Sequence, residues 1–272
     1  MPVVFASAVS HAPGITAWTD AAPEDQKERL FAGYSDTREQ LAASGAELLV
    51  VLTSEHWANF FLDHIGAYCL GMAETYEGPV EPWLNIEKST LKGNPEFSKA
   101  LVDHCYANEF EVSFSYEMKF DHGTMVPLHF LTPEMNLPVI PMFFNTLAPP
   151  RPSPARCMEL GRVIGEFVKS SELKVGLVAT GGLSHDPAET NHGIIDTGFD
   201  ERFLSHITTG DLEALAKYSD ADIVGAGAGT PEILAWFALA GALNGPKGKV
   251  ISYEPIKEWA TGMSVVQFDA AA

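Results

Sequence analysis

The chain begins with Val3-Val4-Phe5-Ala6-Ser7-Ala8-Val9-Ser10-His11, a continuous apolar stretch that ends at a histidine. A second apolar stretch, Leu48-Leu49-Val50-Val51-Leu52, follows a segment with helical spacing over residues 23–43. Gly45 suits the position just after a helix. Strands that are apolar on both faces are typical of a sheet covered on both sides. Strand, helix and strand form a crossover unit, which favours parallel pairing.

The rest of the chain repeats this alternation. We predict further strands over 112–116, 139–144 and 174–180, one or two closing strands over 249–268, short strands and long loops over 59–93, and helices over 94–106, 126–131, 153–168, 200–218 with a break at Gly210, and 230–245. No repeat or break in composition divides the chain. The predicted fold class is α/β: a single domain, residues 1–272, with a central mostly parallel or mixed β-sheet covered by helices on both faces.

Composition narrows the possible functions. The formal net charge of −19 repels phosphate backbones and anionic membranes, so we expect neither a nucleic-acid partner nor a membrane partner. Cys69, Cys105 and Cys157 are widely spaced, which argues against a disulfide framework and indicates the reducing cytoplasm. The first residues carry no basic segment typical of a signal peptide. The apolar stretch 233–243 is too short to span a bilayer, which takes about 20 residues.

Three histidines follow predicted strands where each strand ends. His11 and His56 follow the two strands of the crossover unit, and His185 follows 174–180 after Gly181-Gly182. Ligands of open α/β sheets collect at the carboxyl ends of the strands. The three imidazoles could therefore form one metal or acid–base site. The alternative is that each histidine is a structural residue of its loop.

Two further residues have an ordinary explanation beside a functional one. Glu232, in Thr230-Pro231-Glu232, suits the first turn of a helix, where a carboxylate is favourable. It could equally complete a face of two histidines and one carboxylate, a ligand set typical of non-haem Fe(II). His122, in Asp121-His122-Gly123, is an imidazole beside a carboxylate or an exposed loop residue.

Several common catalytic motifs are missing from the sequence. It contains no phosphate-binding Gly-x-x-x-x-Gly-Lys-Ser/Thr loop, no Gly-x-Ser-x-Gly elbow and no His-Glu-x-x-His helix. The glycine-rich stretch 225–229 precedes a helix but follows no clear strand, so a dinucleotide site is a poor interpretation.

Taken together, these segments resemble the class III extradiol dioxygenases, the family named after the catalytic subunit of protocatechuate 4,5-dioxygenase. The matching pieces run in family order along nearly the whole chain: Ser10-His11-Ala12-Pro13, Glu55-His56-Trp57-Ala58-Asn59-Phe60-Phe61, Phe120-Asp121-His122-Gly123, Gly181-Gly182-Leu183-Ser184-His185 and Glu232-Ile233-Leu234-Ala235-Trp236. Residues 253–259 look like the ending of 2,3-dihydroxyphenylpropionate dioxygenases. Residues 149–161 look closer to protocatechuate and gallate enzymes, so the subfamily is open.

The resemblance implies a function and a role for each residue. His11, His56 and Glu232 would bind Fe(II), His185 would be the acid–base residue, and His122 would assist near the substrate. The substrates would be a catechol and O2, held side by side on the metal, and the ring would open beside its two hydroxyls. No organic cofactor is implied. Lys119, Lys257 and Arg151 are candidates to meet a substrate carboxylate.

The resemblance also bears on partners. The protocatechuate enzymes add a small helical subunit that covers the site, and no such segment is visible in this sequence. Either a partner supplies it or the chain closes its own site with loops 59–93 and 186–200. A homo-oligomer is the family expectation. Two competing hypotheses are a zinc hydrolase that uses the same ligands to activate water and a non-catalytic binding protein of the same fold.

Overall fold

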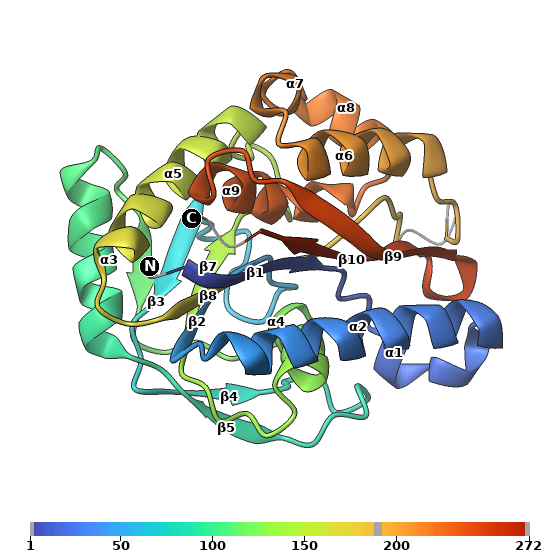
Figure 1. The fold of residues 1–272 in the computed structure, drawn as a ribbon, viewed down its shortest axis with the longest axis horizontal. Coiled ribbons are helices and arrows are strands. Elements are labelled where there is room, and N and C mark those ends of the chain that lie inside the picture. Colours follow the sequence, from blue (N-terminus) through green and yellow to red (C-terminus); the bar gives the residue numbers. More distant parts are fainter. Residues whose placement is uncertain (1–2, 188–191, 270–272) are drawn as a thin grey trace.

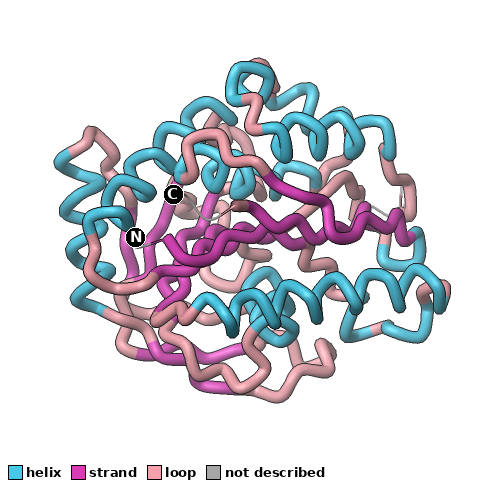
Figure 2. Tube along the Cα trace, viewed as in Figure 1, coloured by secondary structure: helices cyan, strands magenta, loops and turns pink. Residues whose placement is uncertain are grey.

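The computed structural model describes residues 3–187 and 192–269 (Figures 1 and 2). Eight strands form one mixed sheet in the order β6-β3-β7-β2-β8-β1-β10-β9. Their bounds are β1 Val3–Val9, β2 Leu48–Thr53, β3 Tyr68–Gly71, β6 Ser113–Ser115, β7 Val139–Phe144, β8 Val175–Thr180, β9 Gly248–Ile256 and β10 Thr261–Phe268. A separate antiparallel pair consists of β4 Thr75–Gly78 and β5 Ser89–Lys92.

The centre of the sheet is parallel. β7, β2, β8 and β1 pair in parallel in that order, whereas β3 and β10 run antiparallel to their neighbours β7 and β1. The predicted closing segment forms two antiparallel strands, β10 and β9, at one border of the sheet. Because β1, β8 and β2 are adjacent and parallel, the chain leaves all three at the same edge.

Helices cover the sheet on both faces. The α-helices are α1 Gly14–Ala17, α2 Glu24–Ser44, α3 Pro95–Ala107, α4 His122–Leu131, α5 Pro154–Ser170, α6 Thr197–Thr209, α7 Leu212–Ala216, α8 Asp220–Gly225 and α9 Leu234–Ala242. Three short 3-10 segments are η1 Thr19–Ala21, η2 Thr230–Ile233 and η3 Lys257–Trp259. Among the described residues no helix is long and apolar enough to cross a membrane.

Alternate strand residues build a core on each face. Val50 and Leu52 of β2 belong to a cluster with α3, α5, α6 and α9, whereas Leu49 and Val51 belong to a cluster with α2 and α4. Figure 1 shows these two helical layers on opposite sides of the strands. The predicted α/β fold with a mixed sheet covered on both faces is therefore confirmed.

Local signals explain most helix ends. Gly45 ends α2 with a left-handed φ of 68°, and Gly210 breaks the segment after α6 with a φ of 70°. The sequence predicts a loop over 121–124 and a helix over 126–131, and this start of the helix is wrong. Asp121 Oδ1 accepts a hydrogen bond from Gly123 N at 2.9 Å, so Asp121 caps the helix, which begins at His122. The helix predicted from residue 230 begins as the 3-10 turn η2.

Helix α9 lies buried along its whole length and is fixed closely against α5. A Cβ added at Gly161 of α5 would lie 1.9 Å from Ala238 O, and one at Gly165 would lie 2.1 Å from Ala242 O. Because no side chain separates them, the two backbones touch. The segment that carries Glu232, immediately before α9, is therefore anchored in the core.

Candidate active site

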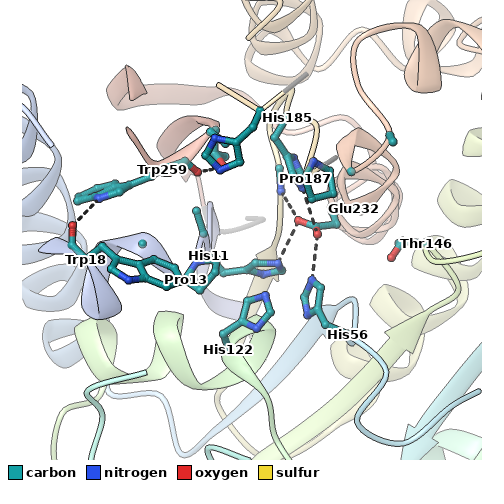
Figure 3. Close-up of a pocket in the computed structure, with 18 of the residues that line it drawn as sticks. His11, Pro13, Trp18, His56, His122, Thr146, His185, Pro187, Glu232 and Trp259 are labelled. Atoms are coloured by element: carbon teal, nitrogen blue, oxygen red, sulfur yellow. Dashed lines mark hydrogen bonds and ion pairs between the residues drawn. The ribbon is translucent and has the colours of Figure 1, made fainter. Parts of the chain in front are cut away.

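The three strand-end histidines meet at one edge of the sheet. His11 follows β1, His56 follows β2 and His185 follows β8, and all three line one cavity of about 570 Å³. Figure 3 shows His11 and His56 pointing at the same carboxylate from different elements. The parallel order of β1, β8 and β2 explains this convergence.

Glu232 supplies that carboxylate. Its Oε2 lies 3.0 Å from His11 Nε2, and its Oε1 lies 3.0 Å from His56 Nε2. His185 Nε2 is also near, at 3.4 Å from Oε1. Backbone geometry fixes Glu232, because Gly182 N donates to Oε2 at 3.0 Å and a Cβ added at Gly181 would lie 2.7 Å from its Cβ. The pair of glycines, both with positive φ, thus permits this close backbone approach.

His11 is oriented by a hydroxyl. Its Nδ1 lies 3.0 Å from Thr180 Oγ1, and that hydroxyl lies 2.6 Å from Thr53 Oγ1. If Nδ1 carries the proton, Nε2 presents its lone pair to Glu232. His11 Nε2 is buried and makes no hydrogen bond of good geometry within the described part of the chain. A lone pair without a hydrogen donor is what a metal ligand requires.

His56 is held by a carboxylate on its far side. Its Nδ1 lies 3.2 Å from Oδ2 of the buried Asp121, whose other oxygen caps α4. Burial opposes ionisation of Asp121, but His56 and His122 lower its pKa to about 2. A carboxylate behind a ligating histidine fixes the ring and raises its basicity.

His122 lies beside the first two histidines. Its ring stacks on His56 with centroids 3.8 Å apart, and its Nδ1 lies 2.7 Å from Glu81 Oε1. One nitrogen each of His11, His56 and His122 lies within 4.8 Å of the other two. The structure therefore brings a third imidazole near His11 and His56, in addition to Glu232.

His185 lies against the glycine-rich segment. Its Nδ1 lies 2.9 Å from Leu183 O, which directs Nε2 into the cavity. A Cβ added at Gly229 would lie 2.1 Å from His185 Nε2, and one at Gly227 would lie 2.2 Å from His185 O. Gly227 and Gly229 thus make room for this histidine, which explains these two glycines without a dinucleotide.

The charges at the site suit a cation. Burial opposes ionisation of Glu232, but His185 and His11 hold its pKa well below the usual range. Burial lowers the pKa of His11 and keeps that ring neutral. Burial also opposes charge on His56, but Asp121 and Glu232 outweigh it and raise its pKa well above the usual value. A metal ion bound here would displace that proton, so its affinity would depend on pH.

The donor set fits one metal ion. Two ligand atoms bound at about 2.1 Å and at right angles lie about 3.0 Å apart. The contacts of Glu232 with His11 and His56 both have this length. With Glu232 ionised and His11 buried without a hydrogen bond at Nε2, His11, His56 and Glu232 are the residues that would hold the ion.

The rest of the cavity lining includes three tryptophans. Trp18, Trp57 and Trp259 line it, and Trp259 Nε1 donates to Trp18 O at 3.1 Å (Figure 3). Of the two predicted lid loops, 59–93 contributes no lining residue, although its Trp83 stacks on Trp18 with ring centroids 5.5 Å apart. Loop 186–200 contributes Pro187 and His192, and its residues 188–191 lie outside the described part of the chain.

The sequence did not single out three positioning residues. For Asp121 the sequence offers one indication of a role in the site, its position next to His122. Thr180 ends a core strand and gave no signal, and neither did Glu81, which reaches His122 from a loop. Conversely, the sequence suggests Lys119, Lys257 and Arg151 as candidates to meet a substrate carboxylate. None of these three residues lines the cavity.

Comparisons with known proteins agree with this geometry. Residues 5–264 match the family described as the catalytic LigB subunit of aromatic ring-opening dioxygenase. A 2,3-dihydroxyphenylpropionate/2,3-dihydroxicinnamic acid 1,2-dioxygenase of Photorhabdus laumondii is 28% identical over 90% of this chain and 91% of its own. One of the same name from Cupriavidus necator is 27% identical over 100% of both chains.

A solved structure shares the fold. The crystal structure of protein JW3007 from Escherichia coli K12 has a TM-score of 0.63 and 17% identity, and the match covers 97% of this chain and 99% of that one. The family match extends over nearly all of the chain, including every residue of the site described above. This protein therefore belongs to the family of the catalytic LigB subunit of aromatic ring-opening dioxygenases, and it is an enzyme of that class.

Proposed function

We propose that the protein is a non-haem Fe(II)-dependent extradiol dioxygenase. It inserts both atoms of O2 into a catecholic ring and cleaves that ring beside its hydroxyls, in the breakdown of aromatic compounds. The observation that carries this proposal is the convergence of His11, His56 and Glu232, with both carboxylate contacts at 3.0 Å. Two histidines and one carboxylate leave open positions on a metal ion, as non-haem iron oxygenases require.

Iron is the metal that this donor set and this family favour. When bound, Fe(II) would hold the catechol oxygens and O2 side by side and pass electron density from ring to oxygen. The protein contributes the orientation of its ligands. Thr180 directs His11, Asp121 directs His56, and Gly182 N directs Glu232.

His185 handles the proton in this proposal. Leu183 O holds Nδ1, so Nε2 faces the cavity and can accept a proton from a substrate hydroxyl. Burial opposes charge on His185, but Glu232 raises its pKa, so the ring retains the proton it accepts. It can later return that proton to the product. His122, held at Nδ1 by Glu81, assists with its other nitrogen near the substrate.

The relatives support a catecholic substrate. Their names specify 2,3-dihydroxyphenyl compounds, in which two hydroxyls occupy neighbouring ring carbons. The aromatic lining by Trp18, Trp57 and Trp259 suits a flat ring.

Oxygen uptake tests the proposal. We expect protein reconstituted anaerobically with ferrous iron to consume O2 when a catechol is added and to form a coloured ring-opened product. His56→Ala should lose iron, whereas His185→Ala should keep iron and lose turnover. Absence of turnover across simple, carboxylated and amine-bearing catechols would contradict the proposal, as would full activity of both variants.

One observation favours a second candidate, a zinc hydrolase. The hydrolase expected from the sequence would use Glu232 as a ligand. In this candidate His122 takes its place, because the group formed by His11, His56 and His122 resembles the three-histidine sets of zinc enzymes that activate water. Metal retention separates the two candidates. The dioxygenase proposal expects Glu232→Ala to lose metal and His122→Ala to keep it, and the zinc proposal expects the reverse. Stoichiometric zinc with ester or amide hydrolysis would favour the second candidate.

A further inference from the structure

The cavity contains an uneven set of charges. Its lining includes the carboxylates Glu232 and Glu258 but no lysine or arginine. Residues 1–2, 188–191 and 270–272, which the structure does not describe, contain no lysine or arginine and so add none to this lining. Apart from its histidines, the cavity therefore offers no side-chain cation to a substrate.

Arg151 lies close to the cavity, but it supports the cavity wall and does not line it. Its Nε donates to Thr146 O at 2.8 Å, and its guanidinium forms an ion pair with Asp220 at 3.3 Å. Thr146 lines the cavity while the arginine behind it does not. Arg151 thus braces the wall from outside, and Asp220 already balances its charge.

Glu258, unlike Arg151, lines the cavity itself. It lies on η3, between β9 and β10, and its exposed side chain lines the cavity. Its carboxylate forms no ion pair within the part of the chain that the structure describes. The adjacent Trp259 is fixed by its hydrogen bond to Trp18 O, so two indoles lie on this side of the cavity (Figure 3).

These groups discriminate between substituents on a catechol ring. A carboxylate entering here would lose water without gaining a lysine or arginine as a partner, and the net charge of −19 would add to the cost. A protonated amine would gain a charge-assisted hydrogen bond to Glu258 and the attraction of indole faces.

On the basis of the proposed function, we propose that the pocket selects a catechol whose side chain carries a protonated amine, with Glu258 as the residue that determines this specificity. This differs from the carboxylate-bearing compounds after which the relatives are named.

Three probes of similar size test the proposal: aminoethylcatechol, ethylcatechol and carboxymethylcatechol. Binding to the anaerobic iron-loaded enzyme is measured by quenching of tryptophan fluorescence, and turnover by oxygen uptake. We expect affinity to fall in that order, with about tenfold between the amine and the carboxylate, a difference of one ion pair near a surface. The difference should shrink as salt is added.

Variants assign the preference to Glu258. Glu258→Gln should reduce the ratio of amine to ethyl affinity by about fivefold, and Glu258→Lys should reverse the order of amine and carboxylate. Glu172→Gln removes the same charge from an exposed residue ahead of β8, at the far end of that strand, and should leave the ratio unchanged. The proposal is overturned if carboxymethylcatechol binds as tightly as ethylcatechol, if no probe binds, or if Glu258→Gln behaves like Glu172→Gln.

The two readouts separate this inference from the proposed function. If the affinities follow the expected order and no probe is cleaved, the ring-opening proposal fails while the charge preference stands. If the probes are cleaved with the carboxylate preferred, only the charge preference fails.

Discussion

Asp121 connects three parts of the site through one side chain. It holds His56 at Nδ1, caps α4 through Gly123 N, and so places His122 at the start of that helix. Its two oxygens are both engaged, and the residue is buried. A change at Asp121 therefore acts on the metal ligands without touching the cavity.

Asp121→Asn should weaken metal binding. The amide retains the shape but loses the charge that raises the basicity of His56, so we expect about a 10–100-fold loss of affinity. Competition with a chelator of known affinity measures it. Asp63→Asn, a change at an exposed aspartate, is the matched control. Equal affinities for Asp121→Asn and the unaltered protein would show that the carboxylate does not support His56.

Asp200 gives the protein a dependence of stability on pH. This buried carboxylate accepts hydrogen bonds from Ser184 N, Ser184 Oγ and Tyr253 OH. Burial outweighs those donors and raises the pKa of Asp200 from 3.8 to about 6. Between these two values the folded state binds more protons than the unfolded state, so the stability from this group falls as pH rises from about 4 to about 6.

Asp200→Asn should remove that dependence. A difference of two pKa units corresponds to about 3 kcal/mol. As pH rises from 4 to 7, the free energy of unfolding of the variant should therefore increase by about that amount relative to the unaltered protein. Urea unfolding at both pH values measures the difference, and Asp63→Asn should show no such gain. A stability difference that does not change with pH would contradict this account.

Sequence patterns could predict some site residues and not others. His11, His56 and His185 follow apolar strands, and strand order alone brings strand ends together. Glu232 had an equally good explanation as a residue in the first turn of a helix, and only the family resemblance favoured it as a ligand. Glu81 acts through a tertiary hydrogen bond from a loop, and no local pattern encodes such a contact.

At the scale of elements, the contact between α5 and α9 fixes the carboxylate ligand. Gly161→Ala would place a Cβ 1.9 Å from Ala238 O, so the helices must separate. We expect a loss of about 1–3 kcal/mol of stability. Weaker metal binding should follow, because Glu232 immediately precedes α9. Chemical unfolding and metal titration measure the two effects.

Gly198→Ala is the control for this prediction. Gly198 lies in α6, where an added Cβ would have its nearest contact at 3.5 Å. Alanine favours helix over glycine, so this variant should be as stable as the original or more stable. If Gly161→Ala matched it, the close contact of α5 and α9 would not limit stability.

Element boundaries show where local patterns fail. The inner strands β1, β2, β7 and β8 and the Gly45 end of α2 followed from apolar runs and a single glycine, whereas β3, β4 and β5 had no predicted bounds. The start of α4 did not, because Asp121-His122-Gly123 contains residues common in loops and the cap depends on the Asp121 rotamer. The pairing of β10 with β1 on one side and with β9 on the other also depends on tertiary order, which the closing segment does not encode.

At the scale of the whole molecule, a bound metal should stabilise the fold. The ligands come from the ends of β1 and β2 and from η2, so the ion would connect distant parts of the chain. Metal at one hundred times its Kd adds about 2.7 kcal/mol, or about 5–10 °C in Tm for a chain of this size. Calorimetry with and without a chelator measures the shift. Glu232→Ala should lose the shift, and an equal shift in that variant would place the metal elsewhere.

The family resemblance predicts a homo-oligomer and leaves a covering subunit open. Trp18, Trp57, Trp259 and Pro187 of this chain already line the cavity. We therefore expect turnover from the isolated polypeptide, without a second gene product. Light scattering gives the mass of the assembly, and oxygen uptake by the purified chain tests its sufficiency. Activity that appeared only on addition of another polypeptide would contradict the second expectation.

Glu258 lies at the tip of a hairpin at the border of the sheet, whereas His11 and His56 follow inner strands of the sheet and Glu232 lies in the buried η2. The exposed Glu258 belongs to neither buried cluster, so its substitution leaves both helical layers in place. If Glu258 sets the substrate preference as proposed, ring opening and substrate choice depend on different parts of the fold. Related enzymes could then acquire different substrates through substitutions in one peripheral turn.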